Sequence, residues 1–472
     1  MVHHHHEVDS VENIRKGPLL IVLLTGAFVA ILNQTLLVTA LPVIKEDLNI
    51  DDNTVQWLQS IFLLVNGIMI PITAFLIARF STRTLFLLAM GSFALGTLIC
   101  TIAPEFLTLL VGRVLQAAGA GIMMPLMQTI MFLIFPIEKR GSAMGLFGLI
   151  ISFAPAIGPT LSGYLIEHYP WRSLFYVVLP IVIIDIVLAY FVLVNVTKQT
   201  FPKVDILSIV LSTLGFGGLL YGFSTAGSSG WHSAEVLLSI VLGAAILTWF
   251  ILRQLKLDTP ILEFRIFKEK IFTLTTVLGM TVFLAMIGGA VILPLLMQDM
   301  LGFSPMQSGL AILPGALIMG VMNPVTGRLF DRFGAKWLSL IGLLFITVTT
   351  FMLAVLNSET TFTYIASVQA IRMLGIAMVM MPVTTAGLNQ LTSEMLPHGT
   401  AMNNTLRQMA GAIGTALLVT IMTSSAIPEE GINGVIHGVN VAFSVAGIIA
   451  AVGLVLTFFI KYHHPGRAKA GE

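Results

Sequence analysis

The sequence predicts an all-α polytopic membrane protein, and three observations support this fold class. Hydrophobic residues make up 56% of the 472 residues and charged residues only 10%, whereas a soluble domain carries about 25% charged residues. The apolar residues fall into runs long enough to cross the hydrocarbon core of a bilayer, which takes about 20 helical residues. Lysine and arginine gather in alternate connections between these runs, as is typical of membrane proteins.

Glycine, proline and charged residues divide the chain into fourteen apolar runs. The first run is longer than the core of a signal peptide and lacks a small-residue cleavage site, so we expect it to be retained as the first helix. The predicted spanning helices are 18–41, 55–79, 84–103, 107–134, 141–166, 173–195, 204–226, 234–253, 271–298, 307–328, 336–356, 362–390, 400–423 and 436–461.

The distribution of positive charge predicts the orientation. If the amino terminus is cytoplasmic, 19 lysines and arginines fall in inner segments and only Lys45 and Arg172 fall in outer loops. Because positive charge concentrates in cytoplasmic loops, we expect both ends of the chain in the cytoplasm.

The remaining composition narrows the class of function. A net charge of +1 does not favour a nucleic-acid partner. The single cysteine, Cys100, cannot form an intrachain disulfide. We find no phosphate-binding glycine loop, no paired carboxylates and no Cys/His ligand set, so we expect no enzyme, no metal and no cofactor, with an ion gradient as the energy source. The histidines His3–His6 are either native or an expression tag.

Two stretches of the chain repeat each other. Residues 139–144 read Lys-Arg-Gly-Ser-Ala-Met, and residues 397–402 read Pro-His-Gly-Thr-Ala-Met. The separation of Gly141 from Gly399 is 258 residues, and that of Arg113 from Arg372 is 259. Repeated halves with a binding site between them are a common plan of transporters. We therefore expect five segments, which are a tail 1–17, a six-helix half 18–195, two additional helices 204–253 that face lipid, a six-helix half 271–461 and a tail 462–472.

Residues 327–336 read Gly-Arg-Leu-Phe-Asp-Arg-Phe-Gly-Ala-Lys, which resembles the cytoplasmic loop motif G-x-L-x-D-R-x-G-x-K of the major facilitator superfamily. The alternative is a basic loop of no specific geometry. The corresponding loop of the first half keeps only Arg79 and Arg83 of the charged positions. The matching positions of the complete motif are Gly327, Arg328, Asp331, Arg332, Gly334 and Lys336.

Further motifs are similar to the fourteen-helix drug:proton antiporter branch of that superfamily, the EmrB/QacA type, with lincomycin-resistance exporters the nearer comparison. Residues 113–121 resemble the fourth-helix motif R-x-x-Q-G-x-G-A. The fifth-helix antiporter motif is matched by Gly148, Pro155, Gly158, Pro159 and Gly163. The resemblance implies the major facilitator fold and a monomer in a bacterial plasma membrane. It also implies an exporter of lipophilic drugs that exchanges them for protons by alternating access.

The first helix departs from the branch. Residues 32–42 resemble the motif L-D-x-T-I-V-N-V-A-L-P, but Asn33 replaces its acidic residue. An amide cannot titrate or offer a negative charge. If the aspartate attracts cationic drugs in relatives, this chain should favour neutral, zwitterionic or weakly basic compounds.

Four charged residues lie deep within the predicted spans, away from their ends. A charge at the bilayer centre costs at least about 2.5–3.5 kcal/mol and points to function. Asp185 is the only carboxylate deep in a span. It either carries the exchanged proton or is a neutral or arginine-paired packing residue. Arg113 is a proton-relay or conformational residue, or else a structural donor to backbone carbonyls. Arg372 is its counterpart in the repeat, and Arg407 either lines the cavity or bridges helices.

If the family fold holds, polar residues of the inner helices should line a central cavity. A methionine such as Met127 suits a promiscuous pocket because its thioether is flexible, although methionines also serve as plain packing. The competing functions are export of one specific metabolite or lipid and a non-transporting membrane sensor. The expected cavity residues are Asn33, Gln34, Gln59, Asn66, Gln116, Gln128 and Met127.

Overall fold

The computed structural model describes residues 15–460, and within this range it has fourteen helices that are long and apolar enough to span a membrane. Each predicted apolar run corresponds to one helix, so the predicted fold class is confirmed. The run at 107–134 is a single helix. The predicted tails 1–17 and 462–472, including His3–His6, lie wholly or mostly outside the described residues. The helices are α1 (Lys16–Leu48), α2 (Asp52–Arg79), α3 (Thr82–Ile102), α4 (Phe106–Ile134), α5 (Arg140–His168), α6 (Ser173–Val192), α7 (Ile206–Ser229), α8 (Ala234–Gln254), α9 (Lys270–Leu295), α10 (Pro305–Phe333), α11 (Ala335–Met352), α12 (Phe362–Leu388), α13 (Leu396–Ser424) and α14 (Ile432–Thr457).

Polar side chains at the connections start several of these helices. The first backbone N–H groups of a helix have no intrahelical acceptor, and a side-chain oxygen can take their place. Asp51 accepts from Thr54 N at the start of α2, and Ser304 with Gln307 forms a capping box at the start of α10. Four short helical turns, η2 (Ile137–Lys139), η3 (Phe264–Lys268), η4 (Leu296–Met300) and η5 (Pro428–Glu430), lie between the long helices.

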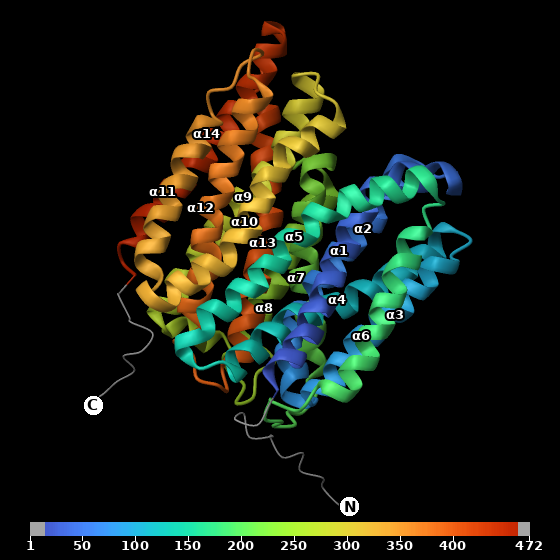
Figure 1. Cartoon of the computed structure of the whole chain (residues 1–472), viewed down its shortest axis with the longest axis vertical. Helices are drawn as coiled ribbons and strands as arrows, with labels where there is room; N and C mark the ends of the chain where they lie inside the picture. The colour runs from blue at the N-terminus through green and yellow to red at the C-terminus, as the bar shows by residue number, and fades with distance from the viewer. Residues whose placement is uncertain (1–14, 461–472) are drawn as a thin grey trace, which may run out of the picture.

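Helices α1–α6, the first half, pack in the same pairs as α9–α14, the second half (Figure 1). In the first half α1 packs against α4, α5 and α6, α4 against α2 and α3, and α3 against α6. In the second half α9 packs against α12, α13 and α14, α12 against α10 and α11, and α11 against α14.

Two seams join the halves. One is formed by α5 and α10, and the other by α2 and α13. Helix α7 packs on both α2 and α13 and so covers the second seam, while α8 packs mainly on α7. The expectation that both additional helices face lipid is thus incomplete for α7, which buries one face against both halves while Ile206, Val210 and Leu214 stay exposed. Its glycines admit neighbouring helices closely, and Gly217 faces Ile68 of α2. The mainly exposed α8 fits the expectation.

The fourteen helices are joined by short connections and run alternately up and down, so α1 begins and α14 ends on the same side of the molecule, toward the bottom of Figure 1. We call this the terminal side. The ends of α4, α10 and α12 and the beginnings of α5, α11 and α13 also lie there.

Candidate functional site

The carboxylate of Asp331, at the end of α10, binds the first turn of α5 across the seam. It accepts hydrogen bonds from the backbone nitrogens of Gly141 and Ser142, each at 2.8 Å, and from the Ser142 hydroxyl. The N–H groups in the first turn of a helix lack acceptors and carry partial positive charge, so an anion is stabilised there. Asp331 thus ties the second half to the first half on the terminal side.

Two glycines let the backbones approach at this contact. A methyl group built at Gly141 would lie 2.6 Å from the carbonyl oxygen of Gly327, and one built at Gly327 would overlap the carbonyl oxygen of Gly141. Gly334 ends α10 with φ of 74°, in the region that favours glycine. The other matched motif residues, Arg328, Arg332 and Lys336, are exposed or half-buried at the same end.

Helices α5 and α10 also contact each other farther from the terminal side. Asn323 donates to Ser152 at 2.9 Å, and Gly148 lies against the Asn323 side chain. Farther from the terminal side, Gly163 has no atom within 4 Å of a Cβ built on it, and Gly309 of α10 has none either. The hydrogen bonds that cross this seam among the described residues thus lie toward the terminal side.

The matched antiporter motif does not form one surface. Gly148 faces α10, whereas Gly158 lies against Thr35 of α1. Pro155 and Pro159 are exposed. Gly148 and Gly158 thus face different neighbours of α5.

The α2–α13 seam has no acid in the place of Asp331, since Ala78 occupies that position. The connection between α6 and α7 covers this end of α2 instead, because Thr200 N donates to Ala78 O at 2.9 Å and Arg79 donates to Pro202 O at 3.1 Å. Arg83 lies over the ring of Tyr190.

The connection between α8 and α9 contacts the beginning of α13 at the same seam. The backbone nitrogen of Glu263 donates to His398 Nδ1 at 3.2 Å. The inserted segment 193–269 therefore touches both halves on the terminal side.

Two further hydrogen bonds cross between the halves where α4 meets α13. Asn404 donates to Gln128 Oε1 at 2.6 Å, and the hydroxyls of Thr129 and Thr400 are 2.8 Å apart. The sequence does not reveal the pairing of Asn404 with Gln128, because the two residues are 276 positions apart. Gln128 is fully buried and its Nε2 has no partner among the described residues.

Arg113 is fully buried within the first half. Its Nε donates to Leu58 O of α2 at 3.1 Å, and its Nη1 donates to Gln116 Oε1 at 2.9 Å. The guanidinium lies 4.2 Å from the centre of the Phe62 ring. Gln116 Nε2 in turn lies 3.5 Å from Asn33 Oδ1, so two of the expected cavity residues belong to this buried network.

Arg372 is held in a similar way in the second half. It donates to Gln369 Oε1 at 3.2 Å and to the carbonyl oxygen of Ala285 on α9. Gly289 of α9 makes room for this guanidinium, because a methyl group built there would overlap it. Both repeat-related arginines thus bind a glutamine one turn away and a carbonyl of another helix.

Arg407 of α13 is also buried, at 5% exposure. Its guanidinium donates to the hydroxyl of Thr384 and lies 3.4 Å from Met380 O, both on α12. Its Nε has no hydrogen-bond partner among the described residues, and neither does Asn403 Oδ1 on the same helix.

Asp185 of α6 is 2% exposed, and neither carboxyl oxygen has a hydrogen-bond partner in the described part of the chain. The groups around it come from other helices. A Cβ built at Gly26 of α1 would lie 3.1 Å from Asp185 Oδ2, 3.1 Å from Phe86 and 2.8 Å from Met123. The carboxyl group therefore lies against the backbone of α1 beside apolar side chains, and no arginine pairs with it.

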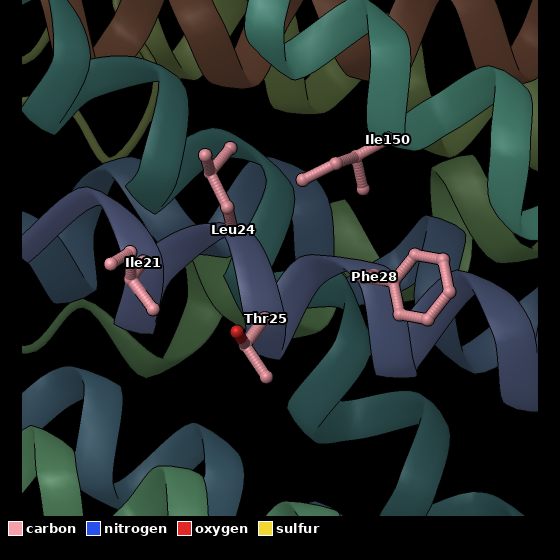
Figure 2. A pocket seen from close by; sticks show the side chains of 5 residues that line it. All are labelled: Ile21, Leu24, Thr25, Phe28 and Ile150. Atoms are coloured by element: carbon pink, nitrogen blue, oxygen red, sulfur yellow. The ribbon is translucent and has the colours of Figure 1, made fainter. Parts of the chain in front are cut away.

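The remaining expected cavity residues differ in exposure. Gln34, Gln59 and Asn66 are half-buried, while Met127 is fully buried. A shallow, mostly open apolar pocket of about 340 Å³ lies elsewhere, between α1 and α5 near the terminal side (Figure 2). Its lining is Ile21, Leu24, Thr25 and Phe28 of α1 and Ile150 of α5.

Comparison with known proteins decides the family. Residues 23–415 match the family described as Major Facilitator Superfamily. The chain belongs to this superfamily. It is therefore a multi-pass membrane transporter, and transport rather than catalysis is the activity of its family.

Relatives place this superfamily member near drug-resistance proteins. It is 54% identical to the "Uncharacterized MFS-type transporter YcnB" of Bacillus subtilis, over 93% of this chain and 94% of that protein. It is 41% identical to the "Lincomycin resistance protein LmrB" of Listeria monocytogenes, over 96% of this chain and 99% of that protein. It is 28% identical to the "Multidrug export protein EmrB" of Haemophilus influenzae, over 86% of this chain and 80% of that protein. The predicted resemblance to the fourteen-helix drug-exporter branch is confirmed by these relatives.

A solved structure shares the fold. The human organic anion transporter MFSD10 (TETRAN) aligns with a TM-score of 0.69 over 94% of this chain and 99% of that chain, at 14% sequence identity. At this identity the likeness shows the fold alone.

Proposed function

We propose that this transporter is a proton-coupled exporter of lipophilic drugs or antibiotics that works by alternating access. The observation that carries the proposal is the uneven α5–α10 seam. Asp331 and Asn323 form hydrogen bonds across it toward the terminal side, while a Cβ built at Gly163 or Gly309, farther along the same two helices, would meet no atom within 4 Å. A seam that is closed at one end and separated at the other is one of the two states that alternating access requires.

The orientation follows from the charge distribution and stays a proposal. We place the terminal side in the cytoplasm of a bacterial cell and the helices in its plasma membrane, with the chain as a monomer. The state described above is then open to the outside, as an exporter must be when it releases its cargo. Relatives that are named for lincomycin resistance and multidrug export support the cargo class.

Asp185 is our candidate for the proton carrier. Removal from water favours the neutral form of a carboxylic acid. Asp185 is buried, has no hydrogen-bond partner among residues 15–460 and lies against α1. A movement of α1 that admits water would let the acid lose its proton, so the site can bind and release a proton as access alternates. No cofactor is needed, because the proton gradient supplies the energy.

Inside-out membrane vesicles test this function. Respiration acidifies the vesicles, and a pH-sensitive dye reports proton release when drugs of different chemistry are added. We expect drug-triggered release with the wild type, its loss with Asp185→Asn and its retention with Asp258→Asn, a matched change in an exposed connection.

The other outcomes separate the alternatives. Release that survives Asp185→Asn would keep the exporter and assign the proton to another group. Release with one compound only would favour export of a specific metabolite or lipid. No release with any member of a broad set of drugs would contradict drug:proton antiport.

A further inference from the structure

The membrane-spanning part of the chain carries an excess of buried positive charge. Arg113, Arg372 and Arg407 are buried in α4, α12 and α13, and the only carboxylate at comparable depth is Asp185. The hydrogen-bond acceptors of the three guanidiniums are backbone carbonyls, glutamine amides and a threonine hydroxyl. These acceptors satisfy N–H groups but leave the charge in place.

No counter-ion neutralises these arginines within the described range. Ion pairs join Arg172 to Asp47, Arg253 to Asp205 and Arg265 to Glu263, all at helix ends or in connections. Asp185 lies against Gly26 in the first half and forms no ion pair with an arginine. Even with Asp185 ionised, the spans keep a net positive charge.

Two side chains next to Arg407 on α13 contact the first half. Asn404, one turn before it, binds Gln128 of α4. Gln408, directly after it, lies 3.5 Å from a Cβ built at Gly67 of α2. The guanidinium of Arg407 itself lies inside the second half, against Gly279 of α9 and the α12 groups Met380 O and Thr384, with its Nε unpartnered.

We propose that Arg407 is a specificity-determining residue and that the substrates are neutral or anionic lipophilic molecules, with permanent cations excluded. The inference rests on the proposed function, since it names the charge class of the exporter's cargo. A cargo bound where α4 and α13 meet, beside Gln128 and Asn404, would lie about one turn of α13 from Arg407. Asn33, which contacts the Arg113 network through Gln116, offers no negative charge to attract a cation. The unpartnered Nε and the nearby amides can donate to an anionic group.

The magnitude of the effect follows from Coulomb's law. A unit charge about 10 Å away, through a medium of effective dielectric constant about 20, changes an affinity by roughly tenfold. The affinities of two ions of equal size and opposite charge should then differ by roughly a hundredfold because of Arg407 alone.

Tetraphenylborate and tetraphenylphosphonium are a matched pair of lipophilic ions of opposite charge. Their apparent Kd values are measured on the purified full-length protein in one detergent, from the shift of the thermal unfolding midpoint with ion concentration. The variants are Arg407→Gln, Arg407→Lys and, as a control in an exposed position, Arg328→Gln. Each ion is compared between variant and wild type, so that its partition into detergent cancels.

We expect Arg407→Gln to raise the apparent Kd of tetraphenylborate roughly tenfold and to lower that of tetraphenylphosphonium. Arg407→Lys and Arg328→Gln should leave both values near wild type. A purely structural role of Arg407 would move both Kd values in the same direction, and that result would overturn the proposal.

Two further results would also overturn the proposal. One is that the wild type binds tetraphenylphosphonium more tightly than tetraphenylborate, and the other is that it binds neither ion. The vesicle experiment is independent of these results. Drug-triggered proton release together with a preference for the cation would remove only the charge-class inference, whereas absence of release would remove the exporter itself.

Discussion

Asp331 accepts both of its backbone hydrogen bonds from the first turn of α5, from Gly141 N and Ser142 N. This carboxylate thus joins the two halves on the terminal side, where Arg140 of α5 also donates to Asn389 Oδ1 at the end of α12. Hydrogen bonds to a charged group contribute about 1.5–3 kcal/mol each. The stability of this closed end relative to an open one should therefore depend strongly on Asp331.

We expect Asp331→Asn to shift the conformational equilibrium away from the state described here by at least about tenfold, because an amide has one acceptor oxygen and no charge. The measurement is thiol labelling of a cysteine at Gly163, whose surroundings are open in this state, in a Cys100→Ser background. Labelling should slow in Asp331→Asn. An unchanged labelling rate would contradict a locking role for Asp331.

The close approach of Gly141 and Gly327 gives a second prediction. Gly327→Val should reduce both transport and the thermal unfolding midpoint, because its side chain would overlap the carbonyl of Gly141 and overpacking costs about 1–3 kcal/mol. Gly163→Val is the matched control, since open space surrounds that glycine on the same pair of helices. Equal effects of the two substitutions on the unfolding midpoint would show that the backbone contact is not tight.

The buried network of Arg113 gives a third prediction. Arg113→Ala should lower the free energy of unfolding by about 3 kcal/mol, because it leaves Leu58 O and Gln116 Oε1 without their donor and removes contacts with Phe62. The measurement is thermal unfolding of the purified protein followed by fluorescence. Arg332→Ala, in an exposed position near the end of α10, should change the free energy of unfolding little. An equally large loss of stability in that variant would point to general surface destabilisation.

The sequence predicts the helices far better than their partners. Each helix is determined by local properties, namely an apolar run of sufficient length and charged or glycine residues at its ends, so all fourteen could be located. The pairing of Arg113 with Gln116 could also be anticipated, because residues three apart share a helix face. Asp331 was found through a motif whose spacing is local.

Contacts between distant segments could not be predicted in the same way. The bond from Asn404 to Gln128 and that from Glu263 to His398 depend on how whole helices pack, and no local pattern specifies the partner. The same holds for Gly26, whose importance appears only when α1 is placed against Asp185. Glycine is frequent in membrane helices, and nothing in the sequence separates this one from the others.

The different coverage of the two seams gives a last prediction. The inserted segment contacts both halves along the α2–α13 seam, through α7 and through Thr200, Pro202 and Glu263. The α5–α10 seam has no such cover. We therefore expect the α2–α13 seam to act as the hinge of alternating access and the α5–α10 seam to open and close.

Paired cysteines test this asymmetry in a Cys100→Ser background. A crosslink between cysteines at Ser152 and Asn323, which are hydrogen-bonded across the α5–α10 seam, should abolish drug-triggered proton release in vesicles. A crosslink between cysteines at Gly67 and Gln408, which approach each other across the α2–α13 seam, should leave most of the proton release intact. Reduction of either disulfide should restore the wild-type signal, which separates the effect of the crosslink from that of the substitutions. If both crosslinks block release equally, the halves must separate at both seams, and the inserted helices cannot be a fixed hinge.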